Sequence, residues 1–91
     1  MRESTRQSRR SGADDASAFE RAFGRILQEA RIERKISQEQ LGFEAGYHRT
    51  YISLIERGLK NPSLKTVLQL AQTLNIPASE LVRRLEVKLR S

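Results

Sequence analysis

The stretch GYHRTYISLIERG, in the middle of the chain, sets hydrogen-bonding side chains beside a thin apolar spine. At 100° per residue, Ile52 and Ile55 fall together on one side of a helix. Arg49, Thr50 and Ser53 fall on the opposite arc. Arginine can grip the O6 and N7 atoms of guanine with two hydrogen bonds, and threonine can meet a base edge or a thymine methyl group. The types and spacing of these residues therefore predict a surface that reads bases in a DNA major groove.

The sequence leaves open the roles of two residues beside this arc. Leu54 lies at its edge and could touch a thymine methyl group, or it is an exposed apolar residue that the fold tolerates. His48 stands just before the helix, where it could reach a phosphate or a base, or be an exposed residue of the turn. We predict no metal site, because His48 is the only histidine and the chain has no cysteine.

A helix-turn-helix is needed to hold such an arc outward, and the preceding residues fit one. Ser37 with Gln40 forms a capping-box pair that predicts the start of a helix. Gly46 predicts its end, since glycine accepts the left-handed conformation that follows a helix. So short a turn forces the two helices to cross steeply. Gly42 is expected where they come closest, because a larger side chain there would push them apart. The apolar residues expected in the crook are Leu41, Ala45, Ile52 and Ile55.

The rest of the pattern is helical throughout and predicts an all-α fold of five short helices. Apolar residues repeat at helical spacing from Ala18 to near Lys35, before the helix-turn-helix. Ser63 is expected to cap a fourth helix, and a fifth runs from about Ala78.

The sequence pattern divides the chain into two parts. Residues 1–17 are almost free of large apolar side chains and are predicted to be a disordered basic tail. Residues 18–91 are predicted to be a helix-turn-helix DNA-binding and dimerisation domain.

Composition favours a polyanionic partner. The net charge is +6 and the sequence pI is about 10.5, which points to nucleic acid first and an acidic membrane surface second. No apolar run approaches the length needed to cross a bilayer, and the first residues lack the apolar stretch of a secretion signal. The absence of cysteine fits a reducing compartment, so we expect a cytoplasmic protein.

A family resemblance rests on one long stretch, SQEQLGFEAGYHRTYISLIERGLKNPSLKTVLQLAQTLNI. From about Phe23 to Leu85 the chain resembles the lambda-repressor-like helix-turn-helix regulators, often called the Xre family. The shared pattern is S-Q-x-x-L, a turn glycine, I-x-x-I-E-x-G, P-S and L-x-x-x-A-x-x-L. The RTYIS and IERG segments are most similar to those of restriction–modification controller proteins. This resemblance implies a small homodimer that binds double-stranded operator DNA and regulates transcription.

The resemblance also implies roles for the positions that match the family pattern. Gln38, first in its helix, would contact a phosphate while the helix N-terminus adds backbone amides. Arg49 and Thr50 would read bases, and Tyr51 and Ser53 would add phosphate or base-edge contacts. The residues expected to face the DNA backbone after the reading helix are Arg57, Lys60 and Asn61.

Three further positions can be compared with the family pattern. Arg31 and Glu56 match a structural pair that joins the first helix to the end of the third. His48 departs from the pattern, because the controller proteins often carry an aspartate there, and histidine is a weaker cap.

Enzymatic activity is not expected. A catalytic site needs a nucleophile, a tuned base and a pocket. No acid completes a triad with His48 and Ser53, and no glycine-rich loop could hold a phosphate. We predict neither catalytic residues nor a cofactor.

The last two helices carry more apolar surface than a core-facing stripe needs. The residues concerned are Val67, Leu70, Leu81, Val82, Leu85 and Leu89. We interpret the excess as a homodimer contact. The alternative is an antitoxin-type module that binds another protein and also its own operator. RNA polymerase is a further expected partner, either blocked by the bound regulator or touched by it.

Overall fold

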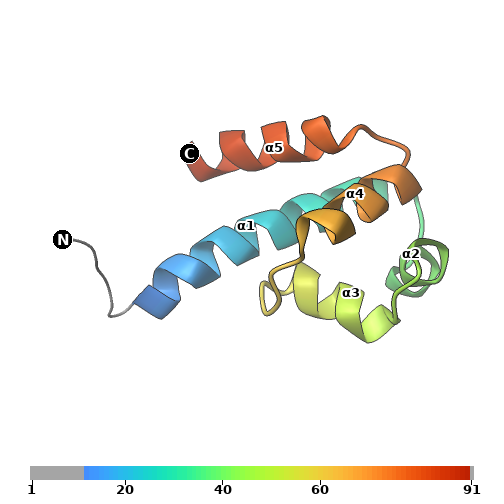
Figure 1. Cartoon of the computed structure of the whole chain (residues 1–91), viewed down its shortest axis with the longest axis horizontal. Coiled ribbons are helices and arrows are strands. Elements are labelled where there is room, and N and C mark those ends of the chain that lie inside the picture. The colour runs from blue at the N-terminus through green and yellow to red at the C-terminus, as the bar shows by residue number, and fades with distance from the viewer. Residues whose placement is uncertain (1–11, 91) are drawn as a thin grey trace.

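The computed structural model describes residues 12–90, which form five helices and no strand. The helices are α1 (Gly12–Glu33), α2 (Gln38–Ala45), α3 (Arg49–Glu56), α4 (Leu64–Thr73) and α5 (Ala78–Arg90). α1 runs through the middle of the molecule, with α5 on one side and the α2–α3 pair on the other (Figure 1). The predicted all-α, five-helix fold is confirmed. Within the described range, no helix has the length and apolar character that a membrane span requires.

α1 begins six residues before the start that the sequence pattern predicts, at Gly12 rather than Ala18. Residues 12–17 add nothing to the apolar stripe, so periodicity gives no signal there, whereas alanine at 13 and 16 has high helix propensity. Residues 1–11, the greater part of the predicted tail, lie outside the described residues.

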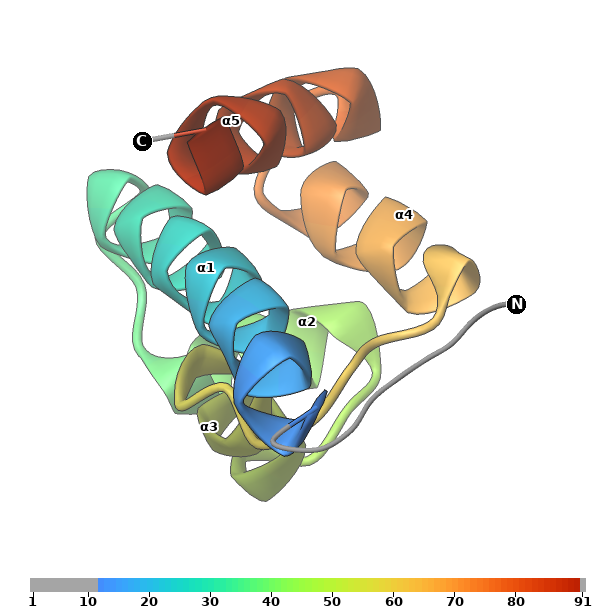
Figure 2. The same cartoon turned by 90° about the vertical axis from the view of Figure 1, so that its left-hand side faces the viewer.

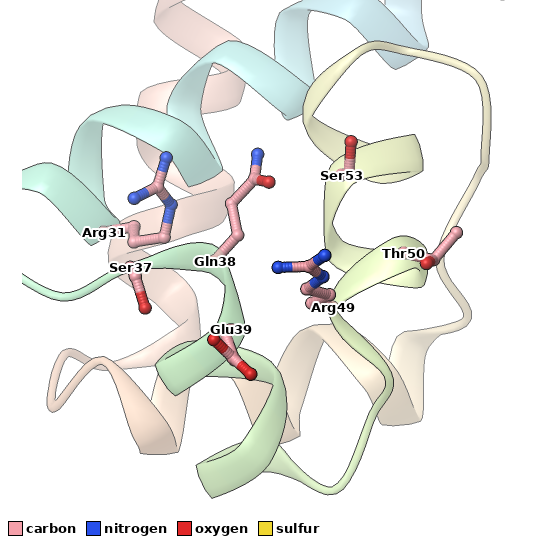
Figure 3. A pocket seen from close by; sticks show the side chains of 7 residues that line it. All are labelled: Arg31, Ser37, Gln38, Glu39, Arg49, Thr50 and Ser53. Atoms are coloured by element: carbon pink, nitrogen blue, oxygen red, sulfur yellow. The ribbon is translucent and has the colours of Figure 1, made fainter.

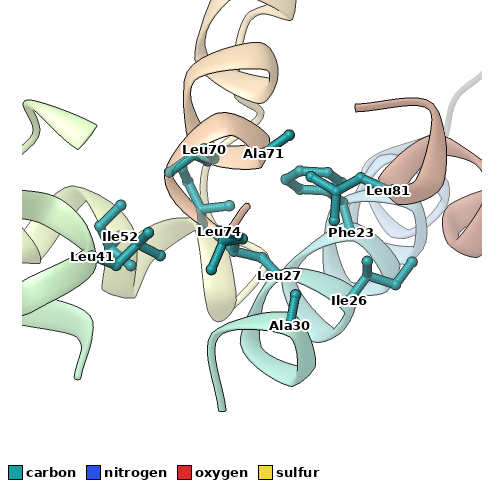
Figure 4. Packing of buried hydrophobic residues seen from close by; sticks show 11 residues of the cluster. Phe23, Ile26, Leu27, Ala30, Leu41, Ile52, Leu70, Ala71, Leu74 and Leu81 are labelled. Atoms are coloured by element: carbon teal, nitrogen blue, oxygen red, sulfur yellow. The ribbon is translucent and has the colours of Figure 1, made fainter. Parts of the chain in front are cut away.

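The core lies where α1, α4 and α5 meet the α2–α3 pair (Figures 2 and 4). Its buried members are Phe23, Ile26, Leu27, Ala30, Leu41, Ile52, Ile55, Leu70, Ala71, Leu74 and Leu81. Leu41, Ile52 and Ile55 have no exposed surface, as expected for the inside of a helix-turn-helix crook. Ala45 is half-buried and packs against the same cluster.

The burial of α4 and α5 corrects part of the predicted dimer contact. Leu70 and Leu81 are both 0 % exposed in the chain's own core, so they offer no surface to a second chain. Their assignment to a contact between chains was wrong. In this small domain the apolar residues of α4 and α5 fill the core as well as any interface. Their helical spacing alone does not show which of them are buried in the core and which are left for a second chain.

The ends of α2 follow the sequence signals. Ser37 Oγ accepts a hydrogen bond from Gln40 N at 2.9 Å and caps the helix, and Gly46 has the left-handed backbone of a C-terminal glycine, with φ at 88°. The capping box is only half formed, because the Gln40 side chain donates to Glu44 Oε2 at 2.6 Å instead of turning back to the cap.

Two glycines allow close helix contacts. A Cβ atom on Gly42 would lie 2.6 Å from Tyr47 O, which agrees with its predicted place at the tightest point of the helix-turn-helix. A Cβ atom on Gly24 would lie 2.4 Å from Ile55 O and 2.6 Å from Glu56 O. Both partners are main-chain atoms, which cannot turn aside as a flexible side chain would. Gly24, which the sequence did not single out, therefore lets α1 cross directly over the end of α3.

Candidate nucleic-acid interface

α3 has one side in the core and one side in solvent. Ile52 and Ile55 are fully buried, whereas Arg49 and Thr50 are exposed and Ser53 is half-buried. The helix is therefore held by its apolar side while its first turn is left free.

An open concavity of about 510 Å³ lies between the start of α2 and the first turns of α3 (Figure 3). It is lined by Arg31, Ser37, Gln38, Glu39, Arg49, Thr50 and Ser53. The Arg49 side chain reaches across it toward Gln38 (Figure 3). Because unpaired backbone amides gather at a helix N-terminus, the start of α2 adds hydrogen-bond donors to this hollow. The predicted base-reading residues Arg49, Thr50 and Ser53 are thus brought together with the predicted phosphate contact Gln38.

A part-buried network forms the inner edge of the concavity. Arg31 donates from Nε to Glu56 Oε2 at 2.7 Å and from Nη2 to Glu56 Oε1 at 3.1 Å, and its Nη1 donates to Ile36 O at 2.8 Å. The Glu56 side chain is only 2 % exposed. The two members of the predicted structural pair therefore contact each other directly. Removing one charge would leave the other buried and unpaired, at a cost of about 3–5 kcal/mol.

Gln38 belongs to this network, which the sequence did not predict. Its Nε2 donates to Glu56 Oε1 at 2.9 Å. A carboxylate can only accept hydrogen bonds, so the amide must turn its nitrogen toward Glu56 and its oxygen away. A phosphate contact from Gln38, which stays a prediction, would use the second N–H of this amide.

His48 caps α3. Its Nδ1 accepts a hydrogen bond from Thr50 N at 3.0 Å, so Nδ1 carries no proton and Nε2 is the donor of the ring. This capping role was not assigned from the sequence, although histidine occupies the position where an aspartate would cap. A phosphate contact by His48 stays a prediction.

The end of α3 is closed by hydrogen bonds around Leu54, which is half-buried. Gly58 N donates to Ile55 O at 3.0 Å and Leu59 N donates to Leu54 O at 2.8 Å, which is the Schellman arrangement around a left-handed Gly58. In this motif the side chain of the residue after the glycine, here Leu59, commonly packs near that of the residue whose carbonyl accepts its hydrogen bond, here Leu54. The main-chain carbonyl of Leu54 thus takes part in closing the helix end, and the contact of its side chain with a base stays a prediction. The exposed residues that follow are Arg57, Lys60 and Asn61.

Tyr47 is a member of this region that the sequence did not reveal. Its ring lies 5.1 Å from that of Tyr51, centroid to centroid, and its hydroxyl contacts Thr66 and Gln69 of α4. Tyr51, a predicted DNA contact, is half-buried beside it. The sequence offered two signals for this contact, a tyrosine in the turn and two polar residues three positions apart on α4, Thr66 and Gln69.

The remaining dimer candidates lie partly at the surface. Val82 and Leu89 are 44 % and 47 % exposed, and Val67 and Leu85 are half-buried. On α4 the structure adds Leu64 and Leu68, which are 73 % and 52 % exposed. We call these six residues the α4–α5 apolar face.

The two carboxyl groups with shifted pKa values lie away from the concavity. Hydrogen bonds from Arg83 and Arg84 lower the pKa of Glu80 to about 2. A hydrogen bond from Arg34 lowers the pKa of Glu44, and Gln40 adds to the effect. Within the described part of the chain, no three His, Cys, Asp or Glu side chains gather as a metal site would require.

Comparison with known proteins identifies the family. The model of the helix-turn-helix family HTH_3 matches residues 27–81, which is more than half of the chain. The chain belongs to this Xre-type helix-turn-helix family. The match includes all of α2, α3 and α4, and therefore the whole concavity.

Several relatives of this helix-turn-helix protein are restriction–modification controllers. It is 39 % identical over 61 residues to the control protein C.BamHI of Bacillus amyloliquefaciens, a match that covers 66 % of this chain and 75 % of that protein. It is 42 % identical to the crystal structure of the controller C.AhdI of Aeromonas hydrophila, with a TM-score of 0.71 over 74 % of this chain and 97 % of that one.

A third structure shares the fold at lower identity. The controller C.Esp1396I, solved as a tetramer with its natural 35-base-pair operator, is 23 % identical with a TM-score of 0.73. The match covers 80 % of this helix-turn-helix protein and 96 % of that chain. At this identity the likeness concerns the fold alone.

Proposed function

We propose that this protein is a sequence-specific regulator of transcription that binds a roughly palindromic operator as a homodimer, as a restriction–modification controller does. The observation that carries the proposal is the free first turn of α3. Arg49 and Thr50 are exposed beside the N-terminus of α2, while Ile52 and Ile55 anchor the same helix in the core. A helix held in this way can enter a major groove without disturbing the fold.

The proposed division of labour follows the geometry. Arg49, Thr50 and Ser53 read base edges, with Leu54 and Tyr51 at the margin of the contact. Phosphate contacts come from the start of α2, from the cap of α3 and from the loop after it. The residues proposed for these phosphate contacts are Gln38, His48, Arg57, Lys60 and Asn61.

Dimerisation is proposed through the α4–α5 apolar face. Four of its six side chains, Leu64, Leu68, Val82 and Leu89, are exposed, and a group of exposed aliphatic side chains is typical of a contact site. A symmetric dimer would place two copies of α3 about 34 Å apart, one turn of DNA, on two half-sites. Because dimer formation and DNA binding are linked by mass action, occupancy of the operator would follow protein concentration.

Regulation would then act through occupancy in the cytoplasm. At one operator position the bound dimer would block RNA polymerase, and at another it would touch the polymerase and activate it. We propose a binding protein rather than an enzyme, since the concavity holds groups that donate and accept hydrogen bonds to DNA and no nucleophile–base pair.

Two measurements on the purified chain test the proposal. Selection of bound duplexes from random DNA should yield one sequence with two inverted half-sites about one helical turn apart. Sedimentation should show a concentration-dependent dimer. Failure to retain any duplex at low ionic strength would refute DNA binding. A stable monomer would favour the antitoxin-type alternative, in which the apolar face binds a different protein.

A further inference from the structure

A chain of hydroxyl groups joins the turn before α3 to α4. The phenol oxygen of Tyr47 lies 2.9 Å from Thr66 Oγ1 and also contacts Gln69 Oε1. Thr66 Oγ1 lies 3.0 Å from Ser63 Oγ, which accepts a hydrogen bond from Thr66 N at 3.1 Å. Thr66 is 5 % exposed, so its hydroxyl must find partners inside the protein. We call these four side chains the Tyr47 chain.

The hydrogen bonds of the Tyr47 chain run in one direction. Gln69 Oε1 can only accept, so the Tyr47 hydroxyl donates to it. The Tyr47 oxygen then accepts from Thr66, and the Thr66 oxygen accepts from Ser63. Each hydroxyl donates once and accepts at least once. Removing the Tyr47 hydroxyl would therefore leave both the Thr66 donor and the Gln69 acceptor without this partner.

The other contacts of Tyr47 reach the reading helix. Its main-chain N donates to Gly42 O at 2.7 Å, at the tightest point of the helix-turn-helix. Its ring packs against Tyr51 of α3, with an angle of 36° between the ring planes. The next residue is His48, the cap of α3. A single side chain thus spans the angle between α3 and α4.

α4 also carries part of the α4–α5 apolar face. Gln69 and Thr66 lie on the side of α4 that meets the turn, whereas Leu64 and Leu68 are exposed elsewhere on the helix. If α4 is fixed in a dimer contact, the angle between α3 and α4 decides how far apart the two copies of α3 stand. A small change in this angle would move both reading helices relative to their half-sites.

We propose that Tyr47 is a positioning residue whose hydroxyl sets the orientation of α3 relative to α4, and thereby the spacing of half-sites that the dimer accepts. The part that concerns spacing rests on the proposed function. The part that concerns orientation belongs to the free chain and is tested without DNA.

The first test is a measurement of helix orientation in the free protein. Residual dipolar couplings of the backbone amides would be recorded for the wild type and for Tyr47→Phe, which keeps the ring and removes the hydroxyl. The couplings of α3 in the variant should no longer fit the wild-type orientation relative to α4, while those of α1 and α5 still fit. Couplings of α3 that are unchanged would overturn the proposal.

The second test is a series of operators in which the separation of the selected half-sites is changed by one or two base pairs. The wild type should lose affinity sharply away from the native separation. In Tyr47→Phe this penalty should shrink roughly three- to tenfold, the range expected when one hydrogen bond is lost. If the Tyr47 hydroxyl only stabilises the fold, Tyr47→Phe would lower the affinity equally at every separation, and that result would refute the positioning role.

Matched variants separate the alternatives. Thr73→Val removes a different α4 hydroxyl, which donates to Gln69 O at 2.9 Å within the helix, and should leave the spacing profile unchanged. Gln69→Leu removes the acceptor while keeping Tyr47, and should reproduce the Tyr47→Phe profile even if the tyrosine variant folds poorly. If the wild type bound no duplex, the proposed function would fail, and the dipolar couplings would still decide the orientation of α3.

Discussion

Arg49, the proposed base-reading residue, lies beside two residues with fixed roles in the fold. His48 caps the helix one position earlier, and Gln38 lies across the concavity with its amide nitrogen held by Glu56. Arg49 is exposed, and its side chain lines the concavity. In the proposed function this side chain would exchange water for a guanine, while the buried Ile52 and Ile55 anchor its helix in the core.

Replacing Arg49 with alanine should relax the preference for one base pair. Each lost bidentate contact costs about 1–3 kcal/mol of discrimination. The measurement is a competition between the selected operator and operators changed at single positions. A loss of affinity that is equal for all sequences would show that Arg49 contacts a phosphate instead.

Lys60 is exposed in the loop after α3 and should act differently from Arg49. Lys60→Ala should weaken all duplexes alike and reduce the slope of log affinity against log salt by about one. Arg90→Ala makes the same change of charge on α5, which lies on the far side of α1 from α3 (Figure 1), and should leave the slope unchanged. An unaltered slope for Lys60→Ala would remove Lys60 from the contact.

At the scale of the elements, the molecule depends on how its helices end and cross. α1, α3 and α4 all end with a left-handed residue, namely Lys35, Gly58 and Asn75, with φ of 65°, 78° and 63°. Each end is closed by a hydrogen bond back to the last helical turn. These closed ends let the chain turn sharply between short helices.

Alanine at the two glycines of the helix-turn-helix should have different consequences. Gly46→Ala meets no atom within 4 Å and only strains a left-handed backbone, so we expect a loss of about 1–2 kcal/mol with operator affinity retained. Gly42→Ala collides with Tyr47 O and should cost about 1–3 kcal/mol and also displace α3. Unfolding by urea and operator titration below the melting temperature measure both effects. Equal operator affinity for the two variants would contradict this account.

The first turn of α5 should contribute stability that depends on pH. The hydrogen bonds from Arg83 and Arg84 hold the pKa of Glu80 at about 2, below the value near 4.3 of a free glutamate. A lowered pKa means that the contribution is full above about pH 5 and is lost as the pH falls through 2. Comparing wild type with Glu80→Gln, the difference in melting temperature should be largest near neutral pH and shrink as the pH falls through 2. Salt should reduce this difference, because the Glu80 side chain is partly exposed to solvent. A difference independent of pH would rule out this ion pair.

The helix-turn-helix could be predicted from sequence because its requirements are local. Ser37, Gly42 and Gly46 stand at fixed positions, and Ile52 and Ile55 have helical spacing. The contacts between distant segments could not be predicted in the same way. Gly24 faces α3 across 31 residues of sequence, from 24 to 55, and Tyr47 reaches α4 at 66 and 69. Periodicity describes one helix at a time and does not say which residues of two helices meet.

At the scale of the whole molecule, the two proposed contact surfaces involve different helices. The concavity is formed mainly by α2 and α3, and the α4–α5 apolar face lies on the last two helices. α1 runs between α5 and the α2–α3 pair and ties them together, through Arg31 to Glu56 and through Glu33 to Arg84 at 3.4 Å. DNA binding and dimerisation can therefore be weakened separately by substitution.

Leu68→Lys should weaken the dimer without unfolding the chain. Leu68 is 52 % exposed, so the substitution leaves the core intact but places a charge on the α4–α5 apolar face. Burying the exposed half of one leucine contributes about 0.8–1.5 kcal/mol per copy, which the substitution would remove. Sedimentation equilibrium measures the dimer constant. Ile32→Lys, at a 57 % exposed position on α1, is the control and should leave that constant unchanged. A dimer unaffected by Leu68→Lys would place the contact elsewhere.

The close crossing at Gly24 affects how genetic data on this protein should be read. A saturation screen that scores reporter output would mark every substitution at Gly24 as harmful, alongside those at Arg49. The two positions would fail for different reasons, since Gly24 allows two helices to pack closely and Arg49 is proposed to contact DNA. Only a parallel measurement of cellular abundance would tell them apart. Variants at 24 should disappear from the cell, whereas variants at 49 should accumulate in full amount yet fail to regulate the reporter.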